Sequence, residues 1–494
     1  MFKRSVILTA IFGILVFPSF VTLKPESLEQ IFNLINKDVL ENGNAYASLG
    51  EATSTIGHRL TGSINGKKGE EFAYNLLKSY GYKNLNYQPF TVESWSRDTV
   101  SLTLVPAESD NFVDVEVVAL AHSPVSSHVS AQIVDCGDGL EGDFEKVKNE
   151  IKGKVALFNI NIQNPDNKSL KNLHRSEKTA LAIEHGAAAV IIANAVEGGV
   201  LLTGTASVTG ELIPIPAVCV SVETGKAIRR WIRDEKNILG VIDMRNFSRP
   251  IKARNVIATI EGTSKKLKKE KIIIGGHLDS WDLATGAMDN GIGSFSVLDI
   301  ARVFKKLNLK TSRTIEFVMF MGEEQGLLGS RNMVKQYLDA NKLEDVKLMM
   351  NLDMVNNTMG FNAMGNDKLK AEMDKIGELM AKIDPAYKNM NRNAAGLHSD
   401  HQPFMIHGVP VCSPSGSFPV KAYNCYHANC DRFDLIDKDQ INNNVRFTAM
   451  MLYALANMNE LPVKKLNDSE TKEFLIKQNL KQELVIGKDW RWDL

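Results

Sequence analysis

The sequence predicts an α/β protein in which helices cover both faces of a mostly parallel central sheet, giving three α/β/α layers, with a second mixed α/β domain inserted into it. From residue 255 onward, near-continuous apolar runs alternate with amphipathic stretches, the pattern of buried parallel strands joined by helices. Between 106 and 250 the apolar runs are shorter and separated by loops, which indicates a domain of its own. The length of 494 residues also exceeds what one hydrophobic core ordinarily supports.

The amino-terminal segment has the pattern of a secretory signal peptide. Lys3 and Arg4 precede an apolar run from about Val6 to Val21, and we assign residues 1–22 to this leader. An uncleaved membrane anchor is the alternative, but Pro18 and the short apolar length disfavour it. We therefore expect a secreted or periplasmic protein with no stable membrane span after the leader is removed.

The remaining chain divides into four predicted parts. Residues 23–105 begin the main domain with two amphipathic helices and then the alternating pattern of β-strands. Residues 106–250 form the inserted domain, and residues 251–460 complete the main domain with regular strand and helix alternation. Residues 461–494 are highly charged, and they either pack peripherally as a helix or contact a partner.

Charge balance gives no support for nucleic acid as a partner. Lys and Arg total 58, as do Asp and Glu, so the formal net charge is zero. A nucleic-acid footprint or a polybasic membrane arm would require an excess of basic residues.

The five cysteines fit an exported protein without proving export. Cys136 and Cys219 lie in apolar, strand-like runs, which predicts buried thiols. Cys425 and Cys430 are close enough in sequence for a local disulfide, and two free thiols are the equally open alternative.

Metal-competent side chains follow three predicted strands of the main domain. His277 follows "KIIIGG", the pair Glu323 and Glu324 follows "RTIEFVMFMG", and Asp353 ends "KLMMNLD". Ligands of open α/β sheets bind beyond the carboxyl ends of the strands, so these residues are expected to converge. Asp289, in the loop before a helix, and the segment "YHANCD" around residue 427 could join them. Such a mixture of imidazoles and carboxylates suits divalent ions, zinc included, and two ions a few ångströms apart form a hydrolytic clamp.

Each of these residues also has a purely structural interpretation. A single histidine after a strand is usually hydrogen-bonded, "EEQG" is a common first helical turn, and Asp289 could cap the following helix. Asp353 is harder to explain in this way, because a carboxylate within so apolar a strand needs a partner. Because the side chains recur at corresponding strand ends, we predict a metal site from the whole set.

The ordered motifs "GGHLDSWD…GAMDNG", "GEEQGLLGS", "NLDMV" and "YH" resemble those of the co-catalytic zinc aminopeptidases related to bacterial leucine aminopeptidase, most closely the carboxypeptidase Q group. The resemblance covers about 25–105 and 255–460 and implies the zinc-exopeptidase fold. The block 106–250, with "VDCGDG" and "IPIPAVCVS", is similar to the protease-associated domain that such enzymes often carry, which would cover the site and limit access.

The resemblance implies a role for each matching residue. Two Zn²⁺ ions would be held by the five ligands His277, Asp289, Glu324, Asp353 and His427. Glu323 would be the general base toward a metal-activated water, and Asp279 would orient the first histidine. Residues assigned to substrate contact are Tyr426, Asp400 and His401, although core packing of Tyr426 and structural support by the other two are the favoured alternatives.

The implied function is hydrolysis of dipeptides or short peptides with a free N-terminus. The implied partner is the peptide substrate, and a homodimer is compatible with the resemblance. Two other interpretations stay open: a single-zinc acyltransferase similar to glutaminyl cyclase, and a receptor-like module of the same fold without catalysis. The complete ligand set favours the enzyme over the receptor-like module.

Overall fold

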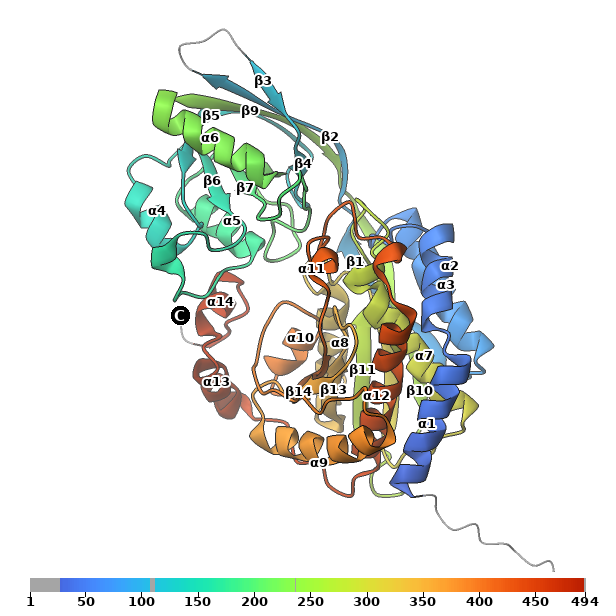
Figure 1. Ribbon diagram of the computed structural model, residues 1–494. Coiled ribbons are helices and arrows are strands. Elements are labelled where there is room, and N and C mark those ends of the chain that lie inside the picture. The colour runs from blue at the N-terminus through green and yellow to red at the C-terminus, as the bar shows by residue number, and fades with distance from the viewer. Residues whose placement is uncertain (1–26, 107–111, 236, 493–494) are drawn as a thin grey trace, which may run out of the picture.

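The computed structural model describes residues 27–106, 112–235 and 237–492, which form two α/β domains (Figure 1). The predicted leader, residues 1–22, lies outside this part of the chain. Among the described residues, no helix combines the length and the apolar character needed to cross a membrane.

The main domain is built on a seven-stranded mixed sheet whose four central strands run parallel. The spatial order is β1 (Leu85–Glu93), β10 (Pro250–Ile260), β12 (Thr314–Phe320), β11 (Lys271–His277), β13 (Val346–Asn351), β15 (Val411–Ser415) and β14 (Gly360–Asn362). Strand β12 is buried along its whole length because helices cover both faces of the sheet, and this is why most of its residues are apolar. The predicted α/β fold is therefore confirmed, with antiparallel pairs at both edges.

Two layers of helices enclose this sheet. One core contains residues of α1 (Leu28–Asn42), α2 (Ala45–Thr55), α3 (Ile64–Ser79), α7 (Ile292–Lys306), α9 (Asp367–Ile383) and α12 (Lys438–Asn457). A second core, on the other face, contains residues of α8 (Leu328–Asp339), α10 (His401–Met405), α13 (Asp468–Lys477) and α14 (Lys481–Ile486). Helix α1 begins after Ser27, whose side chain accepts a hydrogen bond from the backbone N–H of Gln30. The layers bury both faces of the central strands and leave their carboxyl ends for the site.

The inserted domain has a separate eight-stranded sheet. Its order is β3 (Val113–Val115), β2 (Ser96–Pro106), β9 (Ile238–Phe247), β5 (Ser126–Asp135), β6 (Val155–Asn159), β7 (Ala189–Ala193), β8 (Ala217–Val220) and β4 (Val118–Ala119). Three helices complete it: α4 (Glu141–Val147), α5 (Arg175–Glu184) and α6 (Val222–Glu235). Cys136 and Cys219 are buried free thiols, as predicted, and burial raises the pKa of each to about 12.

Two adjacent strand connections join the domains. The chain leaves the main sheet between β1 and β2 and returns between β9 and β10, and Glu93 pairs with Pro250 just before the crossing. The structure thus places the change of sheet at residues 94–95 and 248–249, whereas the sequence predicted a first boundary after residue 105. Strands β1 and β2 share one alternating pattern, so sequence periodicity gave no sign of the crossing between them.

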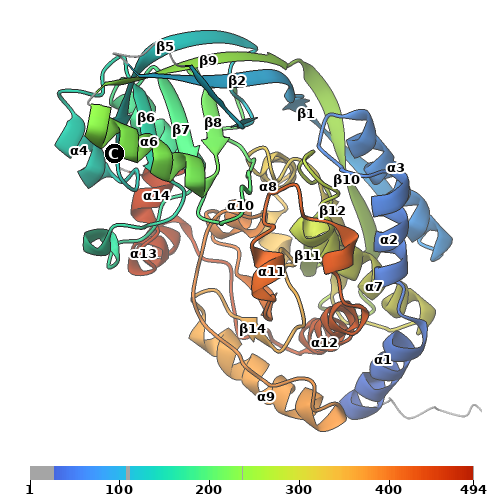
Figure 2. The ribbon, with the colours of Figure 1, turned by 45° about the horizontal axis from the view of Figure 1, so that its top comes forward.

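The C-terminal segment packs against both domains (Figure 2). Leu475, Leu480, Leu484 and Trp490 are buried in the second core of the main domain. Helix α14 also contacts α5 of the inserted domain. The charged segment is therefore part of the junction between the two domains.

Candidate metal and catalytic centre

The parallel central strands deliver the predicted side chains to one place. His277 is the last residue of β11, Glu323 and Glu324 lie in the turn after β12, and Asp353 follows β13. These three strands are neighbours in the sheet, so their carboxyl ends converge. Gly276 permits this approach, because a Cβ there would lie 2.5 Å from the backbone oxygen of Leu352.

Asp289 stands between the two histidines. Its Oδ1 lies 3.3 Å from Nε2 of His277, and its Oδ2 lies 3.0 Å from Nε2 of His427. His277 Nε2 is also 3.3 Å from Asp353 Oδ1, and His427 Nε2 is 3.1 Å from Glu324 Oε2. The side chains thus form two groups, each with one imidazole and two carboxylates, and Asp289 belongs to both.

Asp289 is not a helix cap. It lies in the turn Ala287–Gly291 with an extended backbone (φ −113°, ψ 97°), and Gly291 is the N-cap of α7 without a side-chain cap. Its carboxylate is therefore free to face the histidines.

Backbone carbonyls fix the orientation of both imidazoles. His277 Nδ1 donates to the carbonyl oxygen of Asp279 at 3.1 Å, and His427 Nδ1 donates to the carbonyl oxygen of Thr203 at 3.1 Å. Because a carbonyl oxygen only accepts, each Nδ1 carries the proton and each Nε2 is left for the centre. Thr203 belongs to the inserted domain, so that domain orients a residue of the centre.

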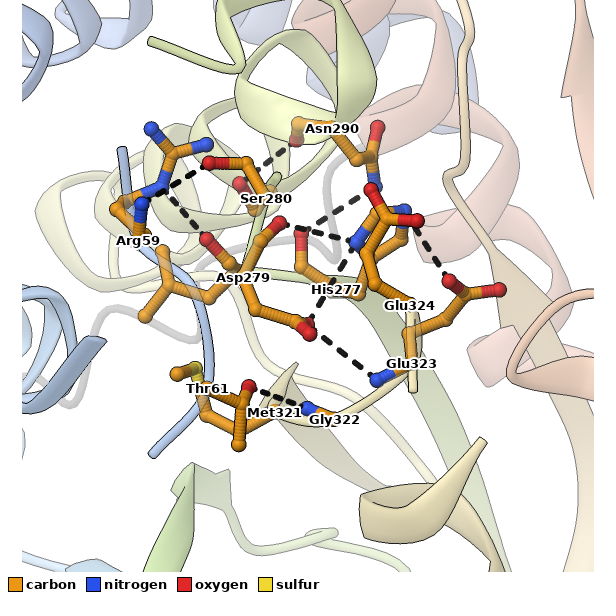
Figure 3. A network of polar contacts seen from close by, with 12 residues as sticks. Arg59, Thr61, His277, Asp279, Ser280, Asn290, Met321, Gly322, Glu323 and Glu324 are labelled. Carbon is orange, nitrogen blue, oxygen red and sulfur yellow. Dashed lines mark hydrogen bonds and ion pairs between the residues drawn. The ribbon is translucent and has the colours of Figure 1, made fainter. Parts of the chain in front are cut away.

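The two adjacent glutamates point differently. Glu324 turns toward His427, and its second oxygen, Oε1, is buried with no hydrogen-bond partner. Glu323 has an oxygen 3.9 Å from His277 Nε2, and its backbone N–H donates to Asp279 Oδ1 at 3.4 Å (Figure 3). Glu324 therefore lies beside His427 and Glu323 beside His277, and both side chains line the adjacent cavity.

Burial and crowding of acids shift the pKa values of the centre. Burial, together with the carboxylates of Asp353 and Glu324, raises the pKa of Glu323 well above its ordinary range. Burial and the neighbouring Asp289 likewise raise the pKa of Glu324, even though His427 opposes the shift. Although burial disfavours the imidazolium form, Glu323 and Asp353 raise the pKa of His277. The arrangement has more acid than its own cations neutralise, which suits positively charged ligands.

Two supporting residues were not predicted from the sequence. Arg59 is completely buried and donates to the carbonyl oxygens of Leu278, Thr285 and Gly286, at 2.6, 2.8 and 2.7 Å. Asp431 accepts hydrogen bonds from the backbone N–H groups of Met288 and Asp289, at 2.7 and 3.0 Å. Both hold the loop that carries Asp279 and Asp289 (Figure 3 shows Arg59). Their partners are backbone atoms, which leave no motif in a sequence.

A cavity of about 330 Å³ opens beside the centre and is lined by both domains. Tyr426 lines it, with its ring stacked on that of His427 at a centroid distance of 4.0 Å. Asp400 and His401, which were predicted to contact substrate, do not line it. Asp400 is completely buried before α10, and His401 Nε2 donates to the carbonyl oxygen of Gly396. Neither side chain is placed to contact a ligand in this cavity, because both are buried at the start of the short helix.

A disulfide closes the loop around the late histidine. Cys425 and Cys430 are bonded, which resolves the alternative left open by the sequence. The loop between them contains Tyr426 and His427. The bond restricts the backbone that positions both side chains.

The fold and the centre fit the predicted metallopeptidase, and comparison with known proteins shows which families the two domains match. Residues 255–452 match the sequence model of peptidase family M28, and residues 126–228 match that of the PA domain. Residues 255–452 are therefore similar to peptidase family M28, and residues 126–228 to the PA domain, which lies within the inserted domain.

Relatives and solved structures agree over most of the chain. Carboxypeptidase Q of Bos taurus is 25% identical over 442 residues, covering 88% of this chain and 89% of the bovine protein. The aminopeptidase of Aneurinibacillus sp. strain AM-1 is 26% identical, with a TM-score of 0.65 over 88% of this chain and 98% of that one. A peptidase M28 precursor from Shewanella amazonensis has a TM-score of 0.75 at 23% identity, covering 89% of this chain and 99% of that one, and shows the same fold.

Proposed function

We propose that the chain is a di-zinc exopeptidase that hydrolyses dipeptides or short peptides with a free N-terminus. The observation that carries the proposal is the position of Asp289, whose two oxygens face His277 and His427 while Glu323 faces the adjacent cavity. A carboxylate shared by two ligand groups is what a pair of ions requires.

The donor set fits zinc. His277, Asp289 and Asp353 would hold one ion, and Asp289, Glu324 and His427 the other. The unpartnered, buried Oε1 of Glu324 supports a cation in this place, because a buried carboxylate oxygen without a donor is costly. Bound zinc supplies positive charge that activates water and polarises the scissile carbonyl.

Glu323 moves the proton in this proposal. It accepts a proton from the attacking water and returns it to the departing amine, so one carboxylate serves as base and then as acid. The raised pKa of Glu323, caused by burial and neighbouring acids, suits a group that must be protonated midway through the reaction. Asp279 Oδ1 accepts from the Glu323 backbone and keeps this residue in place.

The size of the cavity supports a short substrate. A volume of about 330 Å³ lies at the lower end of small-molecule sites, which span roughly 300 to 1,000 Å³. The inserted domain supplies part of the wall, so little room is left for a long chain. The names of the bovine carboxypeptidase Q and the Aneurinibacillus aminopeptidase are consistent with exopeptidase action here.

The test is a Glu323→Gln variant of the zinc-loaded protein, with Glu316→Gln as the matched control. Glu316 lies in the preceding strand β12 and pairs with Lys271, away from the centre. We expect E323Q to retain two zinc ions and its melting temperature while losing at least about 1,000-fold in kcat, and E316Q to retain turnover.

Other outcomes would overturn parts of the proposal. Activity of E323Q near that of the wild type would refute its role as base. Zinc near one per chain would favour the acyltransferase alternative. Equal cleavage of dipeptides and N-acetylated dipeptides would refute the need for a free N-terminus.

We also propose that the protein acts outside the cytoplasm after residues 1–22 are removed. The Cys425–Cys430 disulfide supports this, because such bonds persist mainly in oxidising compartments. Amino-terminal sequencing of the exported protein tests it, and a chain that still begins at Met1 would contradict it.

A further inference from the structure

Arg175 is a buried cation in the wall of the cavity. It is the first residue of α5, in the inserted domain, and its exposed fraction is only 4%. Its Nε has no hydrogen-bond partner, and across 27–106, 112–235 and 237–492 the guanidinium forms no ion pair with a carboxylate. A buried charge is ordinarily paired because leaving water is costly, so the unpaired Arg175 calls for an anion from outside the chain.

The other charged residues at this end of the cavity already have partners. Arg331 pairs with Asp489, with an Nη1–Oδ1 distance of 2.5 Å. Glu177 lies 3.5 Å from His398, and Glu483 pairs with Lys171. Two arginines line the cavity, Arg175 and Arg331. Because Arg331 is paired with Asp489, Arg175 is the one that remains available to a ligand.

Two neighbouring residues, Gly204 and Tyr426, position the guanidinium of Arg175. Gly204 lies against it: a Cβ at that glycine would be 2.0 Å from Arg175 Nε, and the φ of +138° also disfavours other residues. On another side, the guanidinium interacts with the side chain of Tyr426, which is stacked on His427. A single aromatic side chain thus connects Arg175 to a proposed zinc ligand.

We propose that Arg175 binds the C-terminal carboxylate of the substrate and so restricts the enzyme to dipeptides and other very short peptides with a free C-terminus. This inference deepens the proposed function and rests on it. The planar guanidinium matches a carboxylate with two parallel hydrogen bonds, which a point charge cannot reproduce. Because Tyr426 contacts both Arg175 and His427, a carboxylate on Arg175 belongs to a substrate that ends close to the scissile bond.

The test compares an alanine dipeptide with its C-terminal amide, using zinc-loaded full-length protein. In the wild type, we expect kcat/KM for the dipeptide to exceed that for the amide by roughly 10- to 100-fold. Arg175→Met should abolish this preference by slowing the dipeptide alone, and Arg175→Lys should retain part of it. Arg229→Met is the matched control, because Arg229 pairs with Asp135 in the same domain and does not line the cavity.

A binding measurement separates this inference from the proposed reaction. In the Glu323→Gln background, calorimetry should show a dipeptide Kd that R175M weakens by roughly 10- to 100-fold and an amide Kd that it leaves unchanged. Equal use of both substrates by the wild type, or an equal loss for both in R175M, would overturn the inference. A third outcome is that the wild type hydrolyses neither the dipeptide nor its amide but binds the dipeptide more tightly through Arg175. That outcome would support the binding role of Arg175 and refute only the proposed reaction.

Discussion

Replacing Arg59 with methionine should both destabilise the main domain and weaken metal binding. Methionine has a similar length and no donor, so three carbonyl oxygens of the metal-bearing loop, on Leu278, Thr285 and Gly286, lose their hydrogen bonds. Although burial lowers the pKa of Arg59 to about 10, the guanidinium is charged at neutral pH and faces the acids of the centre. The variant therefore removes three bonds and one buried positive charge.

The expected magnitude follows from these contacts. Each lost bond to a charged donor costs about 1 to 2 kcal/mol, which gives about 3 to 6 kcal/mol for the three bonds. For a domain of this size, that loss lowers the melting temperature by roughly 10 °C. Because the loop carries Asp279 and Asp289, zinc affinity should fall roughly 10- to 100-fold.

The assay combines thermal unfolding with zinc release to a competing chelator. Arg313→Met is the matched control: Arg313 is also buried, pairs with Glu270, and lies before the first residue of β12, at the opposite end of the sheet. We expect R313M to lose stability and to keep its zinc affinity. If R59M instead bound zinc as tightly as R313M, the proposal that Arg59 positions the metal loop would be wrong.

Three further perturbations test the centre. Asp279→Asn should lower kcat roughly 10- to 100-fold with zinc retained, because the Asp279 carboxylate accepts a hydrogen bond from the Glu323 backbone N–H. Kinetics with metal analysis check this prediction, and an unchanged kcat would contradict it. Removing zinc with a chelator should lower the melting temperature, and restoring zinc should recover it, because the bound ions stabilise only the folded chain. Equal melting curves of the zinc-free and zinc-loaded protein would exclude a structural contribution of the metal. Replacing Cys425 and Cys430 together with serine should cost about 2 kcal/mol on denaturation and weaken zinc binding through His427; unaltered zinc affinity would show that packing alone holds this loop.

The residues predicted correctly to converge share a local signature. His277, Glu323 and Asp353 each lie at or just after the end of a predominantly apolar strand, and the parallel order of these strands brings their ends together. This rule needs no knowledge of side-chain geometry, so sequence sufficed for the location of the centre and for the fold of the main domain. His427 and Asp289 lie in loops, where the sequence made them candidates only, and the resemblance to a family motif gave them their roles as ligands.

What sequence missed depends on contacts between side chains and distant backbone atoms. Arg59 reaches carbonyl oxygens more than two hundred positions away, and Asp431 binds backbone N–H groups, so neither belongs to a pattern of side chains. Asp400 and His401 follow a loop whose neighbouring residues do line the cavity, yet the first turn of α10 directs both into the interior. Sequence proximity to a site therefore did not predict contact with it.

The inserted domain completes the site as well as covering it. Its Thr203 carbonyl orients His427, and its Arg175 is placed beside Tyr426, so both the proposed metal ligand and the proposed substrate contact depend on how the two domains are joined. Helix α14 contacts α5, which begins at Arg175. Lys171 of the inserted domain also pairs with Glu483 of α14. The charged C-terminal segment thereby fixes the domain that carries Arg175 against the domain that carries the metal centre. A change confined to this junction should alter substrate selection and zinc binding together, because the same contacts position both.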